Sequence, residues 1–302
     1  MRWEDFRASD NVEDDRGGGG GGFGMPFHGG GLGLGTMVVL GIVGWAFGIN
    51  PLYLIQGAEM LNRGGSGYEQ PYQPTTRTSG IPKDETGKFV AAVLGNTEDV
   101  WTQIFRENNL KYQPPRLRLF EGSEQGGCGM AQSAMGPFYC PNDKRIYLDT
   151  SFFRDMQVRF RGCSGKACEF AEAYVIAHEV GHHVQNLIGV LPKAHDAQEA
   201  AGSRAAANRI QVRVELQADC LAGVWANRSN QKWKTIESGD VEAALQTAAA
   251  IGDDRLQKQA RGTVVPDSFT HGSSAQRQQW FSRGLQQGTI SACNTFSSSA
   301  QL

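Results

Sequence analysis

Residues 174–188 read Tyr-Val-Ile-Ala-His-Glu-Val-Gly-His-His-Val-Gln-Asn-Leu-Ile, an apolar stretch interrupted by three histidines and a glutamate. The spacing of its apolar residues predicts a buried helix over residues 169–188. His178 and His182 are four residues apart, so this helix would carry both imidazoles on one face, one turn apart. Burying them without partners is costly, and a shared Zn²⁺ at about 2.0–2.1 Å from each ring nitrogen would compensate. Glu179 would lie beside the metal without binding it, as a general base for a zinc-activated water molecule.

The identity of the third metal ligand is important, because this short pattern also arises by chance as solvated histidines on a helix face. A catalytic zinc site takes three protein ligands and keeps one position open. One common pattern places a histidine six residues after the second, but Ile188 occupies that position. The other takes a glutamate from a following helix, and Glu215, in the helical stretch expected over residues 198–228, is the candidate. Asp219, one turn later, can accept the free ring N–H of a ligating histidine. The alternative for both carboxylates is a solvated face of that helix.

Two other histidines are candidates for supporting roles. His271 lies in a loop with serine and glycine neighbours. There it could donate a hydrogen bond to the oxyanion that forms during peptide hydrolysis. The alternative is an exposed loop histidine without a role. Arg277 could orient His271 or bind substrate. His183 is about 100° around the helix from His182, so we expect a structural role for it.

The folded part of the chain is expected to be mainly helical with a small mixed sheet, an α+β arrangement. The other expected helices span residues 87–110, 198–228 and 240–251, and the expected strands lie in residues 115–121 and in a hairpin over residues 138–149. Asp240 would cap the last of these helices. We expect this domain to span residues 87–295 and to end in a frayed tail, residues 296–302.

The first part of the chain differs in composition from the rest. Residues 1–35 are first acidic and then rich in glycine, which predicts a disordered tail. Residues 36–55 carry no charge and are mostly apolar, and a helix of about 20 such residues can span a membrane once. Asn50 and Pro51 interrupt this stretch, and a buried core helix is the alternative. Residues 56–86 are rich in polar residues and are expected to be a linker.

Composition limits the classes of protein to which the chain can belong. With 302 residues, 40% of them hydrophobic, the chain can bury one core of ordinary size. Its 29 basic and 31 acidic residues give a formal net charge of −2. Because there is no basic surplus to neutralise phosphates, we expect no nucleic-acid partner.

The cysteines carry information about the cellular compartment. The six are Cys128, Cys140, Cys163, Cys168, Cys220 and Cys293. An even number is typical of disulfides in an exported domain, although the sequence does not choose among the pairings. Joining near neighbours, Cys128 to Cys140 and Cys163 to Cys168, is the simplest choice and leaves Cys220 for Cys293. The alternatives are buried thiols in a cytosolic enzyme or a structural zinc site. If the disulfides form, the domain lies outside the cytoplasm.

Over most of its length the chain resembles the bacterial putative neutral zinc metallopeptidase family. The resemblance runs through Met1-Arg-Trp-Glu, Ser9-Asp-Asn-Val-Glu-Asp, the glycine-rich tract, the apolar segment, Gly136-Pro-Phe-Tyr-Cys-Pro, Ile146-Tyr-Leu-Asp, His178-Glu-Val-Gly-His-His-Val-Gln, Glu215-Leu-Gln-Ala-Asp-Cys-Leu-Ala-Gly-Val-Trp and Thr270-His-Gly-Ser-Ser-Ala-Gln-Arg. It implies a zincin-like domain that binds one zinc ion per chain at His178, His182 and Glu215. In the same way, it implies that Glu179 is catalytic.

The chain is similar more widely to zincins that use a glutamate as the third ligand. Those proteins have an aspartate four residues after that glutamate and a distal histidine near the oxyanion. The similarity therefore supports the roles given to Asp219 and His271. Residues 146–149 resemble the edge strand on which zincins hold an extended substrate by strand addition.

These features together predict a zinc-dependent endopeptidase that acts on a peptide or protein substrate. We expect it in the bacterial inner membrane, anchored by a single pass, with the catalytic domain on the periplasmic or extracytoplasmic side. One alternative is a non-catalytic membrane-anchored module with a closed four-ligand zinc site that includes His183 or His271. The others are a zinc hydrolase of another bond and a metal-free interaction protein.

Overall fold

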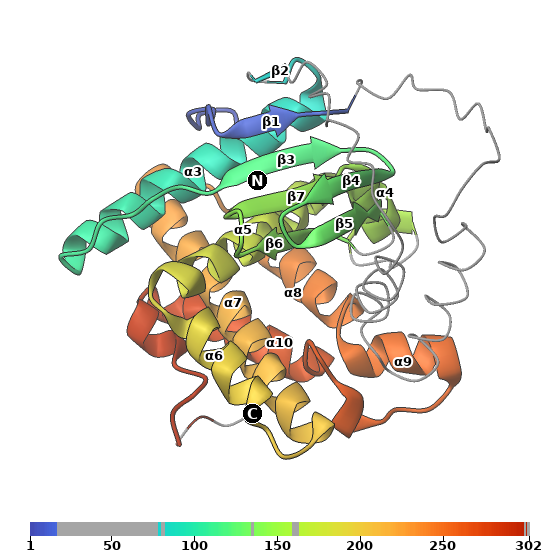
Figure 1. Ribbon diagram of the computed structural model, residues 1–302. Coiled ribbons are helices and arrows are strands. Elements are labelled where there is room, and N and C mark those ends of the chain that lie inside the picture. Colours follow the sequence, from blue (N-terminus) through green and yellow to red (C-terminus); the bar gives the residue numbers. More distant parts are fainter. Residues whose placement is uncertain (17–77, 80–81, 134–135, 159–162, 299, 301–302) are drawn as a thin grey trace, which may run out of the picture.

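The computed structural model describes residues 1–16, 78–79, 82–133, 136–158, 163–298 and 300. They form a mainly helical structure with a small mixed sheet, which confirms the α+β class (Figure 1). The helices are α3 (Glu85–Glu107), α4 (Ser151–Val158), α5 (Cys168–Leu187), α6 (Val190–Glu199), α7 (Arg204–Trp233), α8 (Asp240–Ala250), α9 (Asp253–Arg261) and α10 (Ser274–Gln287), with short 3-10 helices η2 (Gly165–Ala167), η3 (Pro266–Ser268) and η4 (Ile290–Cys293). The strands are β1 (Val12–Asp14), β2 (Thr78–Ser79), β3 (Arg116–Phe120), β4 (Ser123–Gly126), β5 (Gly129–Gln132), β6 (Phe138–Cys140) and β7 (Arg145–Asp149).

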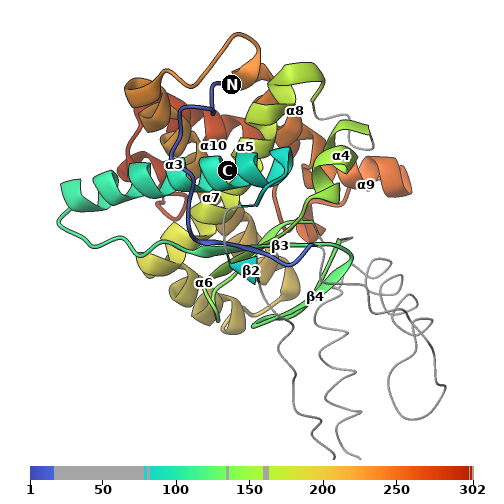
Figure 2. The ribbon, with the colours of Figure 1, turned by 90° about the horizontal axis from the view of Figure 1, so that it is seen from above.

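The main sheet has the strand order β2-β1-β3-β7-β6. β1, β3 and β7 are parallel, and the outer strands β2 and β6 run antiparallel to their neighbours. Side chains alternate between the two faces of β3. Leu117 and Leu119 join the main core, in which α3 and α5 cover one face of the sheet (Figure 2). Arg118 is buried on the opposite face, where its guanidinium lies 2.7 Å from the Glu13 carboxylate.

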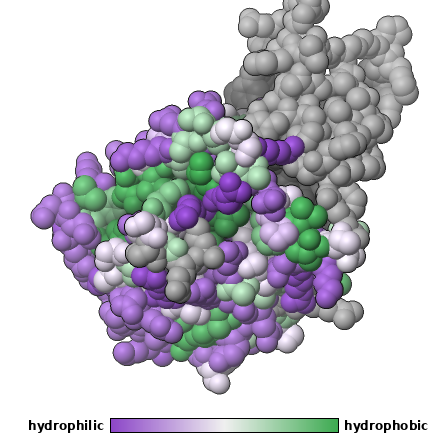
Figure 3. Space-filling view, turned by 90° about the horizontal axis from the view of Figure 1, so that it is seen from below, coloured by the Kyte–Doolittle hydropathy of each residue, from purple (hydrophilic) through white to green (hydrophobic). Residues whose placement is uncertain are grey.

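Helices α5 and α7 form the centre of the helical part. Most of α5 is buried, as expected from its apolar sequence. Gly181 allows α7 to approach α5 closely, because a Cβ atom there would lie 3.0 Å from the Ala218 carbonyl oxygen. The two backbones are therefore near enough for side chains on their facing sides to meet. Away from this core, apolar residues on the surface lie in separate groups among hydrophilic ones (Figure 3).

The three disulfides are those expected from pairing near neighbours and then joining the two remaining cysteines. Cys128 pairs with Cys140, Cys163 with Cys168, and Cys220 with Cys293. The first joins the turn of the β4–β5 hairpin to the edge strand β6, and the second lies where α5 begins. The third ties α7 to η4 near the end of the chain.

Residues 1–16 were expected to be disordered and are instead part of the folded domain. β1 is hydrogen-bonded between β2 and β3. Met1 is buried, and its amino group lies 3.2 Å from the Asp240 carboxylate. The charges that indicated disorder are paired with partners far along the chain, as Glu13 is with Arg118. Local composition cannot show such partners, which is why this expectation was wrong.

The transmembrane helix expected over residues 36–55 lies outside the described residues, as do residues 17–35. Within the described ranges, no helix combines the length and the apolar character that a membrane span needs. The described residues on either side of this stretch belong to one sheet, since β1 pairs with both β2 and β3. A single crossing between β1 and β2 would put them on opposite sides of the membrane. The pairing of β1 therefore argues against the expected single-pass topology.

Three further expectations need correction. The helix expected over residues 198–228 begins at Arg204, because residues 190–199 form the separate helix α6, in whose first turn Pro192 is tolerated. Asp240 is the first residue of α8 and not its cap. Residues 146–149 are not at the edge of the sheet, because β7 lies between β3 and β6. Among the described strands, β6 lies at that edge of the sheet and β2 at the other.

Candidate metal centre

The three candidate ligands come together between α5 and α7. The Nε2 atoms of His178 and His182 lie 3.3 and 3.5 Å from Glu215 Oε2. The ligand atoms of all three residues lie within 4.8 Å of one another. Ligands at about 2.0–2.1 Å from a tetrahedral zinc ion are about 3.4 Å apart, so these nitrogen–oxygen distances fit. Two imidazoles and one carboxylate also form a usual donor set for catalytic zinc.

Asp219 supports His178 from the side away from Glu215. Asp219 Oδ1 lies 2.8 Å from His178 Nδ1 and accepts a hydrogen bond from the Tyr174 hydroxyl at 2.6 Å. Asp219 Oδ2 accepts a hydrogen bond from Arg277 Nε at 2.8 Å. With Nδ1 donating to Asp219, His178 Nε2 is free to face the metal position. Burial alone would lower the pKa of His178, but Asp219 and Glu215 outweigh it and raise this pKa to about 10. A field that favours a proton so strongly also favours a cation.

Two glutamines that the sequence analysis missed hold the other two candidate ligands. His182 Nδ1 lies 2.8 Å from Gln185 Oε1, and Gln211 Nε2 donates to Glu215 Oε1 at 2.8 Å. The second contact leaves Glu215 Oε2 to face the two histidines. Both glutamines stand three or four residues from the ligand that they contact, so helical spacing could have found them.

Glu179 is buried next to the candidate ligands. The backbone of Tyr139, in strand β6, is near enough to this carboxylate to act on its pKa, which it lowers. Burial raises the pKa of Glu179, although the charges of His178 and His182 act in the opposite direction. A carboxyl group whose pKa is raised can take up a proton and later return it, as a general base does.

A family described as "Putative neutral zinc metallopeptidase" matches residues 1–296 of this chain. The chain belongs to this family. It is 46% identical over 305 residues to the "Uncharacterized protein YpfJ" of Escherichia coli (strain K12), and the match covers 99% of this chain and 100% of that protein. It is also 46% identical over 227 residues to the "Uncharacterized protein Rv2575" of Mycobacterium tuberculosis, which covers 70% of this chain and 73% of that protein. No solved structure matches the chain.

In this member of the zinc metallopeptidase family, an aspartate orients His271. Asp253 Oδ2 accepts the backbone N–H groups of residues 270–272, and Asp253 Oδ1 lies 3.4 Å from His271 Nδ1. The His271 side chain is 52% exposed, and its hydrogen bond with Asp253 raises its pKa. No local pattern in the sequence points to Asp253, which begins the helix α9. Arg277, expected to orient His271 or bind substrate, instead pairs with Asp219.

His183 turns away from the metal position and ties α5 to the sheet. Its Nε2 donates to the Gln113 carbonyl oxygen at 2.6 Å, and the Tyr139 hydroxyl donates to its Nδ1 at 3.0 Å. Burial lowers the pKa of His183 to about 4, so the ring is neutral as these contacts require. Because both ring nitrogens are engaged, His183 is not available as a fourth ligand. The expected structural role of His183 is its link to β6.

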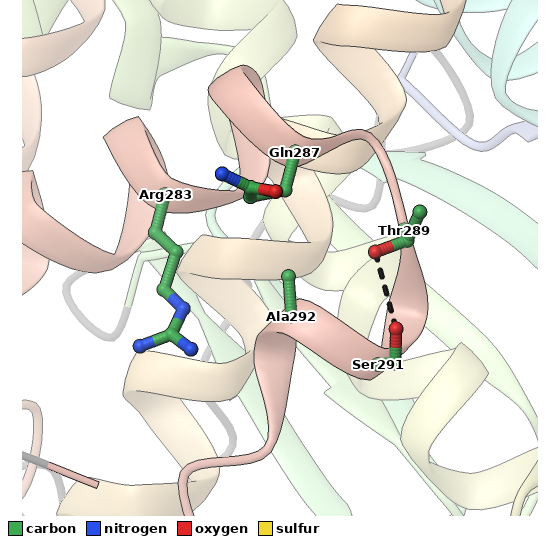
Figure 4. A pocket seen from close by; sticks show the side chains of 5 residues that line it. All are labelled: Arg283, Gln287, Thr289, Ser291 and Ala292. Carbon is green, nitrogen blue, oxygen red and sulfur yellow. Dashed lines mark hydrogen bonds between the residues drawn. The ribbon is translucent and has the colours of Figure 1, made fainter.

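A pocket at the end of α10 is separate from the metal centre (Figure 4). It is lined by Arg283, Gln287, Thr289, Ser291 and Ala292. The hydroxyl groups of Thr289 and Ser291 are hydrogen-bonded to each other at 3.2 Å. These five residues offer no carboxylate and no imidazole, so the pocket lacks the donors that the zinc site needs.

Proposed function

We propose that this chain is a zinc-dependent endopeptidase in which Glu179 is the general base. The observation that carries the proposal is the convergence of His178, His182 and Glu215 on one position, with Glu179 buried beside them. Three protein ligands leave a coordination position open, which is the arrangement of catalytic zinc sites. A zinc ion held there would supply Lewis acidity that lowers the pKa of a water molecule toward about 7.

Glu179 would move one proton during the reaction. It takes the proton from the attacking water as the water oxygen bonds to the peptide carbonyl carbon. It then gives the proton to the amide nitrogen as the carbon–nitrogen bond breaks. The raised pKa of Glu179 supports this role, because it helps the carboxylate to take up a proton. The nearby Tyr139 backbone supports it as well, because it places the carboxylate beside β6.

His271 is the candidate donor to the negative charge that develops on the carbonyl oxygen. The charge of Glu215 helps to raise the pKa of His271, which favours the protonated form that donates a hydrogen bond. Asp253 holds the Nδ1 side of the ring, so Nε2 is left to face substrate. A donor fixed before the reaction lowers the barrier typically by a few kcal/mol.

The edge strand β6 is the proposed binding strand for the substrate. Within the part of the chain that the structure describes, β6 has β7 as its single strand neighbour. An extended peptide could therefore add to its outer side by main-chain hydrogen bonds. The Tyr139 backbone contacts Glu179, so a peptide on β6 would lie next to the proposed base.

The closed four-ligand zinc module is a weaker explanation of this site. It would need a fourth protein ligand, and among the described residues the candidate group contains three. The two nitrogens of His183 are already hydrogen-bonded to Gln113 and Tyr139. His271 is held by Asp253 and has the raised pKa of a donor.

We also propose that the domain works outside the cytoplasm. The three disulfides support this location, because such bonds persist in oxidising compartments. β1 would share the compartment of the catalytic residues, since it is paired with β3. Attachment to a bacterial inner membrane stays a prediction of the sequence, and the pairing of β1 counts against its single-pass form.

The test uses the full chain, because a fragment beginning near residue 80 would lack β1. We expect about one zinc ion per chain by elemental analysis, and cleavage of a peptide library. Glu179→Gln should keep the zinc and lose activity by about 10²- to 10⁴-fold, the usual contribution of a general base. The control is Glu172→Gln, a glutamate two turns earlier on the same helix, which should keep both. Zinc without any cleavage by the unmutated chain would instead support the non-catalytic module.

A further inference from the structure

A row of buried amides connects His182 to a disulfide bond. Gln185 accepts from His182 Nδ1 at 2.8 Å, and its Nε2 donates to Gln217 Oε1 at 2.9 Å. Gln217 Nε2 in turn donates to the Cys293 carbonyl oxygen at 2.8 Å. Cys293 is bonded to Cys220 on α7. Gln185 and Gln217 are buried, so these contacts are shielded from water.

The directions of these hydrogen bonds are fixed by two backbone carbonyl oxygens. A carbonyl oxygen can only accept, so the Gln217 atom facing Cys293 must be Nε2. Gln185 also faces a carbonyl oxygen, that of Val214 at 2.8 Å, so the atom there must be its Nε2 as well. Gln185 Oε1 is then left to face His182, and His182 Nδ1 must carry the proton.

This assignment decides which nitrogen of His182 can bind a metal. With the proton held on Nδ1, the lone pair is on Nε2, the atom that faces Glu215. All the hydrogen bonds in the row run in the same sense, from the imidazole to the Cys293 carbonyl. Bonds in such a chain polarise one another and strengthen the last donor and acceptor.

We propose that Gln185 and Gln217 are positioning residues for zinc, and that the Cys220–Cys293 disulfide anchors them. The disulfide holds the Cys293 carbonyl in place, and this carbonyl orients Gln217. Gln217 and the Val214 carbonyl together position Gln185, which sets the tautomer and angle of His182. Loss of any member therefore weakens zinc binding without removing a ligand. The effect decreases with distance from His182. The inference rests on the proposed zinc site and adds a residue-level account of what keeps it ready for the metal.

The C-terminal segment has its own contacts that keep this anchor in register. Arg213 on α7 donates to the Thr295 carbonyl oxygen, and the Thr295 hydroxyl donates to the Arg213 carbonyl oxygen. Thr295 and Cys293 are fully buried. The residues after η4 are thus fastened to the helix that carries Glu215.

The test measures zinc affinity of the full chain by competition with a chelator, so it does not depend on peptidase activity. We expect Gln185→Leu to weaken zinc binding by about 10- to 100-fold, the range for partners of metal ligands. Gln217→Leu, which leaves the disulfide intact, should lose roughly 10-fold, and the pair Cys220→Ala with Cys293→Ala somewhat less. The controls are Gln278→Leu, a partly buried glutamine on α10 bonded to the Leu245 carbonyl, and the pair Cys163→Ala with Cys168→Ala. Both should bind zinc within about twofold of the unmutated chain.

A second readout separates positioning from general loss of structure. Nitrogen-15 spectra of the histidine side chains should show His182 protonated on Nδ1 in the unmutated chain and in folded Gln217→Leu, where Val214 still orients Gln185, and a mixture of tautomers in folded Gln185→Leu. Equal zinc affinity for Gln217→Leu and the unmutated chain would overturn the proposal, since the row would then end at Gln185. Equal losses in the two cysteine-pair variants would also overturn it, since the effect would then not be specific to Cys220–Cys293. Absence of zinc from the unmutated chain would overturn the proposed function itself.

Discussion

The helical side and the sheet side of the metal centre are built in different ways. On the helical side, His178, His182 and Glu215 project from two helices, and their partners lie mostly on the same helices. On the sheet side, Tyr139 of β6 contacts both Glu179 and His183 from a distant part of the chain. The proposed metal ligands and the proposed substrate-binding strand therefore belong to separate parts of the structure. Mutations on the two sides should therefore have separable effects on zinc affinity and on cleavage.

The largest effect is expected on the helical side, at the carboxylate ligand. Glu215→Ala removes one of three proposed ligands, so zinc affinity should fall by more than the roughly 100-fold that partner residues contribute. Competition with a chelator measures it, and Gln211→Leu is the control, since that residue only holds Glu215 Oε1. Its loss should be smaller, within about 10- to 100-fold. If Glu215→Ala kept one zinc ion at unchanged affinity, the third ligand would have to be another residue.

The next effect is expected in stability, on the sheet side. Glu13→Ala removes the carboxylate that accepts hydrogen bonds from two nitrogens of the buried Arg118 guanidinium, Nε and Nη2. Arg118 keeps Glu124, so we expect a loss of about 2 kcal/mol in the free energy of unfolding, below the full cost of an unpaired buried charge. Denaturant unfolding measures the change.

Asp10→Ala is the control for this change, because Asp10 is exposed in the same N-terminal segment. It should unfold like the unmutated chain. Folded Glu13→Ala should bind zinc normally, since β1 belongs to the sheet side. Unchanged stability in Glu13→Ala would contradict the pairing of β1 with β3, and with it the objection to a single membrane crossing.

The sequence predicted the helical side well and the sheet side poorly. His178, His182, Glu215 and Asp219 follow helical spacing, which is a local property, and the structure brings all four together. Two of the disulfides join cysteines that are close in the sequence, so a local rule predicts them, and the third joins the two cysteines that remain. The sequence did not predict that residues 1–16 are folded or that Asp253 contacts His271, because the partners of these residues are distant in the sequence and follow no repeating pattern. For the same reason the edge strand was assigned to residues 146–149, when β6 has that position.

The third effect tests whether the sheet side acts on cleavage. Tyr139→Phe removes the hydroxyl that bonds His183 and Asn186, and so loosens β6 against α5. A net hydrogen bond contributes about 0.5–1.5 kcal/mol, so kcat/KM should fall roughly 3- to 10-fold. Zinc affinity should not change. The control is Tyr147→Phe in the neighbouring strand, whose hydroxyl donates to Asp143 on the other face. Equal losses in both variants would show a general effect on the sheet and not a role for the link between β6 and α5.

The last effect depends on pH and compares two glutamates on α5. Burial raises the pKa of both Glu172 and Glu179, and for Glu172, where Glu169 adds to the rise and Gln157 opposes it, the value is about 7. The unfolded chain should ionise Glu172 near pH 4.5, so the folded state loses relative stability as pH rises from 4.5 to 7. Glu172→Gln removes this loss. We expect it to stabilise the chain by about 1–2 kcal/mol at pH 8 and by much less at pH 5, after allowing for partial exposure.

Denaturant unfolding of Glu172→Gln at the two pH values measures this difference, and peptide cleavage should be unchanged. Glu179→Gln should show the complementary result, with cleavage lost and zinc kept. Both glutamates lie on α5, and burial raises the pKa of both. They differ in their position relative to the candidate metal ligands and to β6. If Glu172→Gln also abolished cleavage, the effect of Glu179→Gln could not be assigned to its place beside the metal and the Tyr139 backbone.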